Sequence, residues 1–204
     1  MAEVVIGIRD RGGRVGTGTA ALVALDAALT VAERVDLDLA AELPARRIYH
    51  ATPSPAQVTR AAAAATAAAR AGLSRLLKRL EGHRAVSVAV PIGIPGPEVL
   101  DLPLAHVLAK HTLIHAAEAE LYRDALAIAA TDLDLPVTRY PVRGVANAAA
   151  SALRLPTDKL TGKLAELGRR VGRPWRAEHA HAAAAALLSA SADSGRYPPD
   201  NGAP

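Results

Sequence analysis

The chain has 204 residues, of which 50% are hydrophobic but only 2% aromatic, and its formal net charge is +4. This length suits one domain, whose core has to be built from Ala, Leu, Val and Ile through many close contacts. The sequence contains no cysteine, which excludes disulfides, cysteine-ligated zinc and thiol catalysis. The mild positive charge is compatible with a DNA or RNA partner without requiring one.

The sequence predicts neither a secretory signal nor a membrane-spanning helix. The N-terminus lacks a basic segment followed by an apolar one, and no uninterrupted apolar run reaches about 18 residues. We therefore expect a cytoplasmic protein.

Three short β-rich segments open the chain. Residues 3–9 form a short segment rich in β-branched side chains that ends near a Gly-Gly pair typical of a hairpin, after which the chain returns through 15–25. A third extended segment follows at about 29–39, although 27–34 would also fit a helical turn. Together these segments predict an antiparallel meander of three strands.

The first long helix has the clearest start signal. Ser54 is the expected N-cap, with Pro55 in the first helical position and Gln57 three residues after the cap. We expect this helix to end near residue 81. The apolar segment at 85–90 then suits a buried parallel strand.

Helix and strand patterns alternate again in the second half of the chain. The predicted elements are a long helix at 101–131, a fifth strand at 135–142, and helices at about 144–153, 157–171 and 175–190. A meander followed by two helix–strand crossovers gives an α/β protein with a mixed sheet (three antiparallel and two parallel strands), helices on both faces and extra C-terminal helices. We expect a single domain over 1–190 and a disordered tail over 191–204, which is rich in Ser, Asp, Gly and Pro.

This order of elements resembles the ribonuclease H-like fold, and in detail the RuvC-type Holliday junction resolvases. Residues 5–12 (Val-Ile-Gly-Ile-Arg-Asp-Arg-Gly) are similar to the Gly-Ile-Asp-x-Gly that opens such domains, and 86–90 occupies the place of their fourth strand. The closing helix from Pro174 resembles the final helix that completes their site. The resemblance implies a nucleic-acid partner and hydrolysis by two Mg²⁺ or Mn²⁺ ions, held by carboxylates from strand one, strand four and the last helix.

The sequence departs from this pattern at the metal-binding positions. Arg9 stands where the resemblance places the strand-one Asp, and Asp10 comes one residue later, which on a strand is the opposite face. After Val90 comes Pro91, with no acid before Glu98. The resemblance therefore implies a nuclease centre that is rearranged or lost.

One set of candidate catalytic side chains spans three elements, as a metal site requires, since neighbours on one helix cannot surround an ion. The set consists of Asp10, Glu118, Glu120, Glu178 and His181, of which Asp10, Glu118, Glu178 and His181 are the candidate metal ligands. The histidine shifts the preference from Mg²⁺ towards Mn²⁺ or Zn²⁺.

A second metal hypothesis uses the long helix alone. His111, His115 and Glu118 are spaced i, i+4 and i+7, so they share one face, and two imidazoles with a carboxylate can bind zinc or a non-haem metal. Glu178 or His181 are candidates for further ligands. The alternative is that these residues form the polar outer face of an amphipathic helix.

The same helix carries the densest group of potentially catalytic side chains, between His115 and Arg123. The alternative explanation is a solvated face on which Arg123 pairs with Glu120 three residues earlier.

The C-terminal helices carry the basic residues expected to contact nucleic acid. They hold more Arg and Lys than a helix C-terminus favours, and the only tryptophan lies among them, where it would stack on a base or fill the core. The candidate nucleic-acid-binding residues are Arg169, Arg170, Arg173, Trp175 and Arg176.

Three functions stay open at this point. The first is a nucleic-acid-associated protein of the ribonuclease H/RuvC-like class, a divergent or inactive metal-dependent nuclease. The second is a non-catalytic interaction or assembly module, including a homodimer, because an alanine-rich helical surface can pack against a second copy. The third is a metal-dependent hydrolase that uses the helix face at 111–118.

Overall fold

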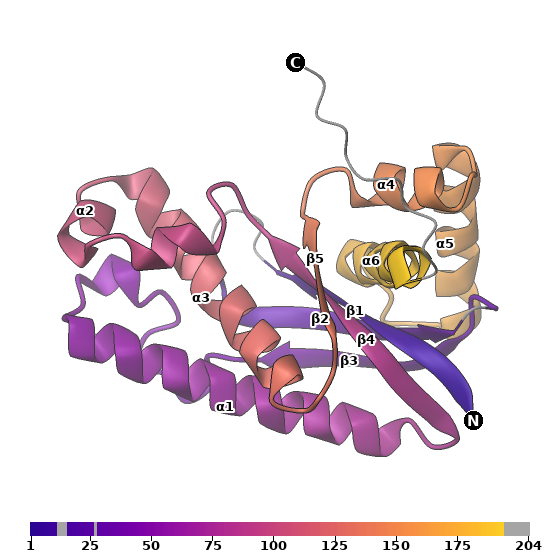
Figure 1. Cartoon of the computed structure of the whole chain (residues 1–204), viewed down its shortest axis with the longest axis horizontal. Helices are drawn as coiled ribbons and strands as arrows, with labels where there is room; N and C mark the ends of the chain where they lie inside the picture. The colour runs from indigo at the N-terminus through magenta and orange to yellow at the C-terminus, as the bar shows by residue number, and fades with distance from the viewer. Residues whose placement is uncertain (12–15, 27, 194–204) are drawn as a thin grey trace.

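A five-stranded sheet lies between two layers of helices in the computed structural model, which describes residues 1–11, 16–26 and 28–193 (Figure 1). Its strands lie in the order β3-β2-β1-β4-β5, with β1–β2 and β2–β3 antiparallel and β1–β4 and β4–β5 parallel. The predicted mixed sheet is therefore confirmed. The strands are β1 (Ala2–Asp10), β2 (Thr19–Asp26), β3 (Val31–Asp38), β4 (His83–Ile92) and β5 (Val137–Pro141).

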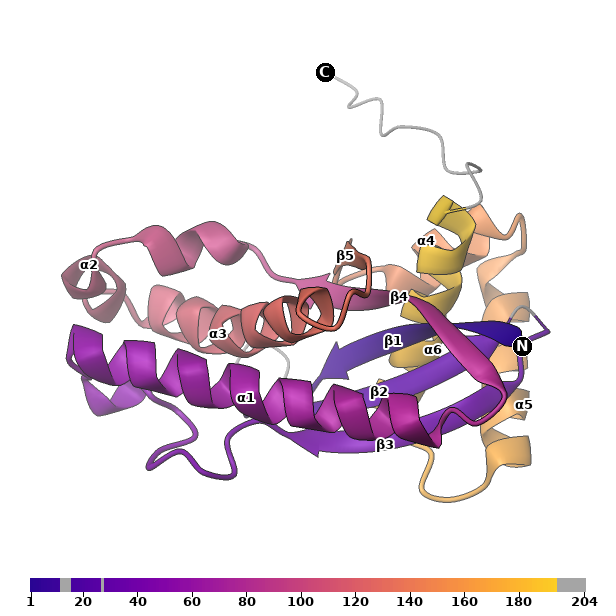
Figure 2. The same ribbon diagram turned by 60° about the horizontal axis from the view of Figure 1, so that its bottom comes forward.

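Helices cover both faces, as expected. One face carries α1 (Pro55–Arg79) and α3 (His111–Thr131), and the other carries α6 (Ala177–Asp193), against which α4 (Val145–Ala152) and α5 (Thr157–Val171) pack (Figure 2). Three short helical segments complete the described elements: η1 (Tyr49–Ala51), η2 (Pro97–Asp101) and α2 (Leu104–Leu108). No helix in the described part of the chain is both long and apolar enough to cross a membrane.

The two helix layers follow from the alternation of side chains along β1. Val4, Ile6 and Ile8 belong to the core under α1 and α3, whereas Val5 belongs to the core under α6. Gly7 is the point of closest approach, because a Cβ atom built on it would lie 1.8 Å from the carbonyl oxygen of Ala182 in α6. A glycine here lets an alanine-rich helix lie directly on the strand.

The capping box that predicted the start of α1 is present. The Ser54 side chain accepts a hydrogen bond from the Gln57 amide, and the Gln57 side chain accepts one from the Ser54 amide. The helix ends at Arg79, two residues before the expected end.

The predicted continuous helix over 101–131 is broken. Its span contains the end of η2, the short α2 and then α3, with Lys110 extended (φ −131°, ψ 113°) just before His111. Neither Ala109 nor Lys110 is a helix breaker, so the local sequence carries no signal for this interruption.

The C-terminal boundary also differs from the expectation. Helix α6 continues to Asp193, past the boundary predicted at 190. The remainder of the predicted tail, 194–204, lies outside the described residues, as does the Gly-Gly pair of the first hairpin.

Candidate functional site

Arg9 and Asp10 lie at the C-terminal end of β1 and face opposite sides of the sheet. Asp10 continues the row of Ile6 and Ile8 and meets Arg123 of α3. Arg9 continues the row of Gly7, which faces α6. The one-residue offset seen in the sequence therefore places the carboxylate on the α3 side and Arg9 in the row that faces α6, with Nη1 of Arg9 3.1 Å from Oδ1 of Asp10.

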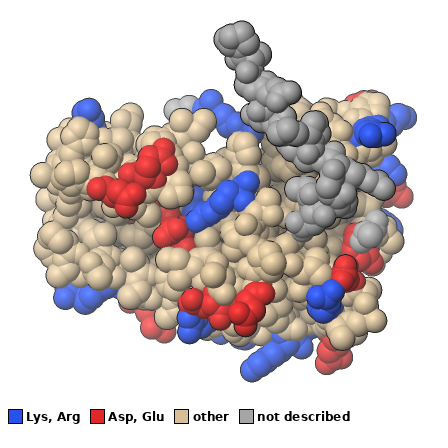
Figure 3. Space-filling view, in the orientation of Figure 1, with Lys and Arg blue, Asp and Glu red and all other residues tan. Residues whose placement is uncertain are grey.

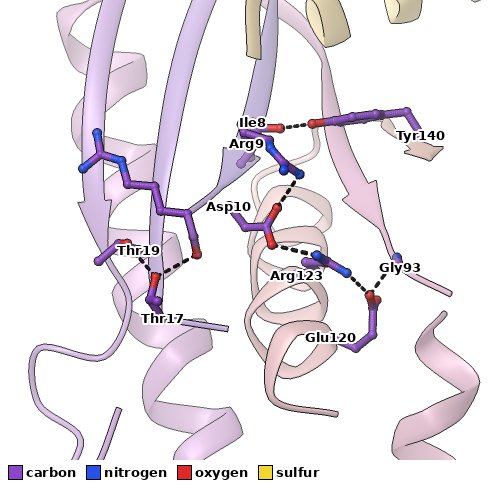
Figure 4. Close-up of polar contacts among 10 residues, drawn as sticks. Ile8, Arg9, Asp10, Thr17, Thr19, Gly93, Glu120, Arg123 and Tyr140 are labelled. Carbon is purple, nitrogen blue, oxygen red and sulfur yellow. Dashed lines mark hydrogen bonds and ion pairs between the residues drawn. The ribbon is translucent and has the colours of Figure 1, made fainter. Parts of the chain in front are cut away.

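Asp10 forms part of a buried ion-pair network with α3 (Figure 4). Its Oδ2 accepts hydrogen bonds from Nη2 (2.7 Å) and Nε (3.2 Å) of Arg123, while Nη1 of Arg9 donates to Oδ1 (3.1 Å). Arg123 also donates to Oε1 of Glu120, which accepts a second bond from the Gly93 amide (2.8 Å). Two guanidinium groups thus neutralise two carboxylates.

The expected ion pair between Arg123 and Glu120 is present, but the prediction that this pair lies on a solvated helix face is wrong. Glu120 is fully buried, and Arg123 and Asp10 are 4% and 6% exposed. Burial alone would lower the pKa of Arg123, but the charges of Asp10 and Glu120 outweigh it and hold that pKa above its usual value. Arg123 therefore stays protonated at any physiological pH.

The α6 side of the sheet lacks carboxylates at the ends of β1 and β4 among the described residues. Gly7 pairs with Ala89 in the parallel register, so Arg9 neighbours Pro91. Ala89 is buried in the α6 core, and Glu98, in η2, accepts a hydrogen bond from the Gly96 amide. Neither strand offers an acidic ligand to this face.

Glu178 and His181 lie on the first turns of α6, on the Arg9 side. Partial burial lowers the pKa of His181, the Arg9 charge lowers it further, and the Glu178 charge opposes both. Glu178 and His181 belong to the α6 side of the sheet, whereas Asp10, Glu118 and Glu120 make their contacts on the α3 side.

The neighbouring His179 has a structural role. It is 1% exposed, its Nδ1 accepts a hydrogen bond from the Arg176 amide (3.0 Å), and its Nε2 lies 3.2 Å from Oδ1 of Asp36 in β3. Its ring also stacks on Trp175, with ring centroids 5.6 Å apart. These contacts fix the start of α6 to the edge of the sheet.

Trp175 packs against the core on the α6 side, and a contact with nucleic acid stays a prediction. It is half-buried between His179 and α5, where a Cβ on Gly168 would lie 2.3 Å from Cδ1 of the indole. The basic candidates around it, Arg169, Arg170, Arg173 and Arg176, are exposed. Figure 3 shows basic and acidic side chains scattered over a largely uncharged face, with both kinds along the edge that α5 occupies.

A group of three histidines occupies the α3 side, at some distance along the helix from the ion-pair network. His50 in η1 lies beside His111 and His115 in the first turns of α3, and one potential ligand atom from each lies within 4.8 Å of the others. Nδ1 of His50 is 3.0 Å from Oε2 of the fully buried Glu118. Burial raises the pKa of Glu118, and this hydrogen bond with His50 opposes the shift.

Sequence reasoning found His111, His115 and Glu118 as one helix face but missed His50. This histidine precedes α1 by five residues and reaches α3 only through tertiary packing. A weak signal was available, because the short segment 46–50 carries two arginines and a histidine beside a buried tyrosine.

No protein-family model matches the chain, and no curated protein matches it significantly in sequence. Solved structures do match. Among them are RuvC of Thermus thermophilus, with a TM-score of 0.52 over 95% of each chain, and RuvC of T. thermophilus in complex with a Holliday junction substrate, with a TM-score of 0.54 over 95% of this chain and 97% of that one. The chain has the ribonuclease H-like fold of RuvC. Identity to both is 18%, so the likeness concerns the fold.

The RuvC-like fold implies a two-Mg²⁺ centre, and the residues of this chain do not fit one. Mg²⁺ requires oxygen ligands. On the α6 face the end of β1 offers Arg9, the end of β4 offers Ala89 and Pro91, and the carboxylate of Asp10 is already paired with Arg123 on the other face.

Proposed function

We propose that this protein binds structured nucleic acid, with a four-way DNA junction as the first ligand to test, and that it does not cleave nucleic acid by two-metal catalysis. The binding part is supported by the shared fold with RuvC, which has been captured with a Holliday junction, and by the exposed arginines of α5 and the segment that follows it.

The loss of catalysis rests on one observation above all. Arg9 presents a guanidinium on the α6 side of β1, where a two-metal centre needs a carboxylate. Its positive charge repels a divalent cation, and the nearest acid along β1, Asp10, is paired with both Arg9 and Arg123. Glu178 on α6 would then be a lone carboxylate rather than one of three.

The proposal is tested by measuring binding and cleavage on the same substrate. A fluorescent four-way junction and a duplex of matched length are titrated with the full chain, with Mg²⁺ and then Mn²⁺. We expect junction binding that weakens steeply with salt and no product with either metal. Cleavage that is lost in Glu178→Gln would overturn the inactive assignment, and absence of binding at low salt would overturn the nucleic-acid assignment.

The other sequence-based expectations stay predictions. Assembly as a homodimer is tested by sedimentation of the full chain, and the cytoplasmic location by fractionation of cells that express it.

A further inference from the structure

The histidine triad combines residues from two elements that no local pattern connects. His50 comes from η1, between β3 and α1, whereas His111 and His115 come from the start of α3. The ring centroids are 4.2 Å apart for His111–His115, 4.9 Å for His50–His115 and 5.8 Å for His50–His111. Three imidazoles so close together repel one another if protonated, but as neutral groups their nitrogens can bind a shared ligand.

The break in the helix before α3 makes this meeting possible. Lys110 is extended, so α3 begins at His111 and its first turn is directed independently of α2. His111 and His115 then lie one turn apart on the side of α3 that faces η1.

Glu118 determines which nitrogen of His50 is available. It is fully buried, and its Oε2 lies 3.0 Å from Nδ1 of His50, which as a neutral imidazole donates that proton and leaves Nε2 as an acceptor. A carboxylate that holds the far nitrogen of a histidine is the usual outer partner of a metal-bound imidazole. A further sign comes from His115, whose Nδ1 is buried without a hydrogen-bond partner among the described residues.

We propose that His50, His111 and His115 bind a divalent transition-metal ion of the zinc type, with Glu118 as a positioning residue for His50. The three ligand atoms already lie within 4.8 Å of one another, and on a tetrahedral Zn²⁺ they would be about 3.4 Å apart. Rotation of the exposed rings of His50 and His111 supplies the difference.

The ligand set determines the metal class. Three neutral nitrogens suit Zn²⁺, Co²⁺ or Ni²⁺ and do not suit Mg²⁺, which prefers oxygen. Three protein ligands leave a fourth position for water or an anion. This site does not depend on nucleic-acid binding.

The test uses the full chain without a polyhistidine tag. Co²⁺ binding is followed by the visible absorption bands of tetrahedral cobalt, and Zn²⁺ binding by calorimetry, with excess Mg²⁺ present. We expect one ion per chain, and we expect His111→Gln and His115→Gln each to weaken binding by roughly 10-fold or more. His106→Gln, which changes an exposed histidine on α2, is the matched control and should leave binding unchanged.

Glu118→Gln separates a positioning role from a structural one. The amide oxygen can still accept a hydrogen bond from Nδ1–H of His50 but lacks the negative charge. We therefore expect metal affinity to fall roughly 10–100-fold while the cobalt spectrum and the one-to-one stoichiometry are kept. The melting temperature of the metal-free variants shows whether they fold. The proposal is overturned by absence of binding at millimolar metal, by binding that Mg²⁺ displaces, or by binding indifferent to both His111→Gln and His115→Gln.

Discussion

Arg123 shows how a single residue turns acidic side chains into structural ones. It bridges Asp10 at the end of β1 and Glu120 on its own helix, and Gly93 leaves room for the bridge, because a Cβ there would lie 2.6 Å from Nη1 of Arg123. Buried carboxylates joined in this way hold β1, α3 and the loop after β4 together. These carboxylates form ion pairs with an arginine and are not free to bind a metal ion.

Removal of this arginine should destabilise the fold strongly. Arg123→Met leaves two buried carboxylates without their partner, and we expect the free energy of unfolding to fall by about 3–5 kcal/mol. Arg139→Met is the matched control, since Arg139 pairs with the partly exposed Asp124 and its removal should cost about 1 kcal/mol or less. Urea denaturation of both variants checks this, and equal decreases in stability would contradict it.

His179 makes stability depend on pH. Burial lowers its pKa from 6.5, and the charges of Arg34 and Arg11 lower it further, although Asp36 opposes them. Below pH 6.5 the unfolded chain takes up a proton that the native state resists, so stability falls as the pH decreases towards the native pKa. Above about pH 7, both states are neutral at this residue and its contribution is constant.

The measurement is the melting temperature between pH 7.5 and about pH 5. We expect it to decrease as the pH falls, because the unfolded chain binds more protons at histidine than the native state does. His179→Asn should flatten the decline, while His106→Asn, at an exposed position, should keep it. The slope does not vanish in His179→Asn, since His115 and His181 also have lowered pKa values. An unchanged slope in His179→Asn would refute the assignment.

Side-chain chemistry was only partly visible in the sequence. The offset of Asp10 was evident from strand alternation, and so was the shared face of His111 and His115, because both follow from a fixed period. The contacts of His50 with Glu118 and of Asp10 with Arg123 span 68 and 113 residues. No local period encodes such contacts, so these partners emerged only with the fold.

At the scale of elements, the contact between β1 and α6 sets the spacing of one layer. Gly7→Ala would place a methyl group against the backbone of α6, and neither backbone can rotate away as a side chain can. We expect a decrease of about 3 kcal/mol or more in the free energy of unfolding. Gly162→Ala is the matched control, because Gly162 is exposed within α5 with no atom near the added methyl group, and it should gain about 0.5–1 kcal/mol. Thermal and urea unfolding would contradict the prediction if Gly7→Ala were neutral.

Elements with strong local signals were predictable, and those defined by packing were not. The capping box identified the start of α1, and the apolar segment at 85–90 identified β4. The interruption at Lys110 has no glycine or proline to mark it. It depends on how η2 and α2 pack over α3, which is information beyond a local window.

At the scale of the whole molecule, the sheet separates two regions with different chemistry. The α3 side holds the histidine triad and the neutralised ion-pair network, and the α6 side leads to the exposed arginines around α5. The order of strands could be predicted because meanders and right-handed crossovers leave few topologies. The placement of these two regions on opposite faces of the sheet could not be predicted, since it depends on which face each side chain reaches.

This separation allows the nucleic-acid surface to be tested by charge removal on either side of the sheet. Replacement of Arg169, Arg170 and Arg173 by Ala should weaken junction binding and reduce the log–log salt slope by about 0.9 for each phosphate that is no longer neutralised. The control removes the same charge from the opposite layer through Arg60, Arg75 and Lys78, which are exposed on α1. Both triple variants keep the core intact, so their melting temperatures should match that of the parent.

If the affinity of both variants fell equally, binding would reflect net charge alone and the α5 surface would have no special role. A decrease confined to the first variant would place the junction on the α5 side, away from the histidine triad.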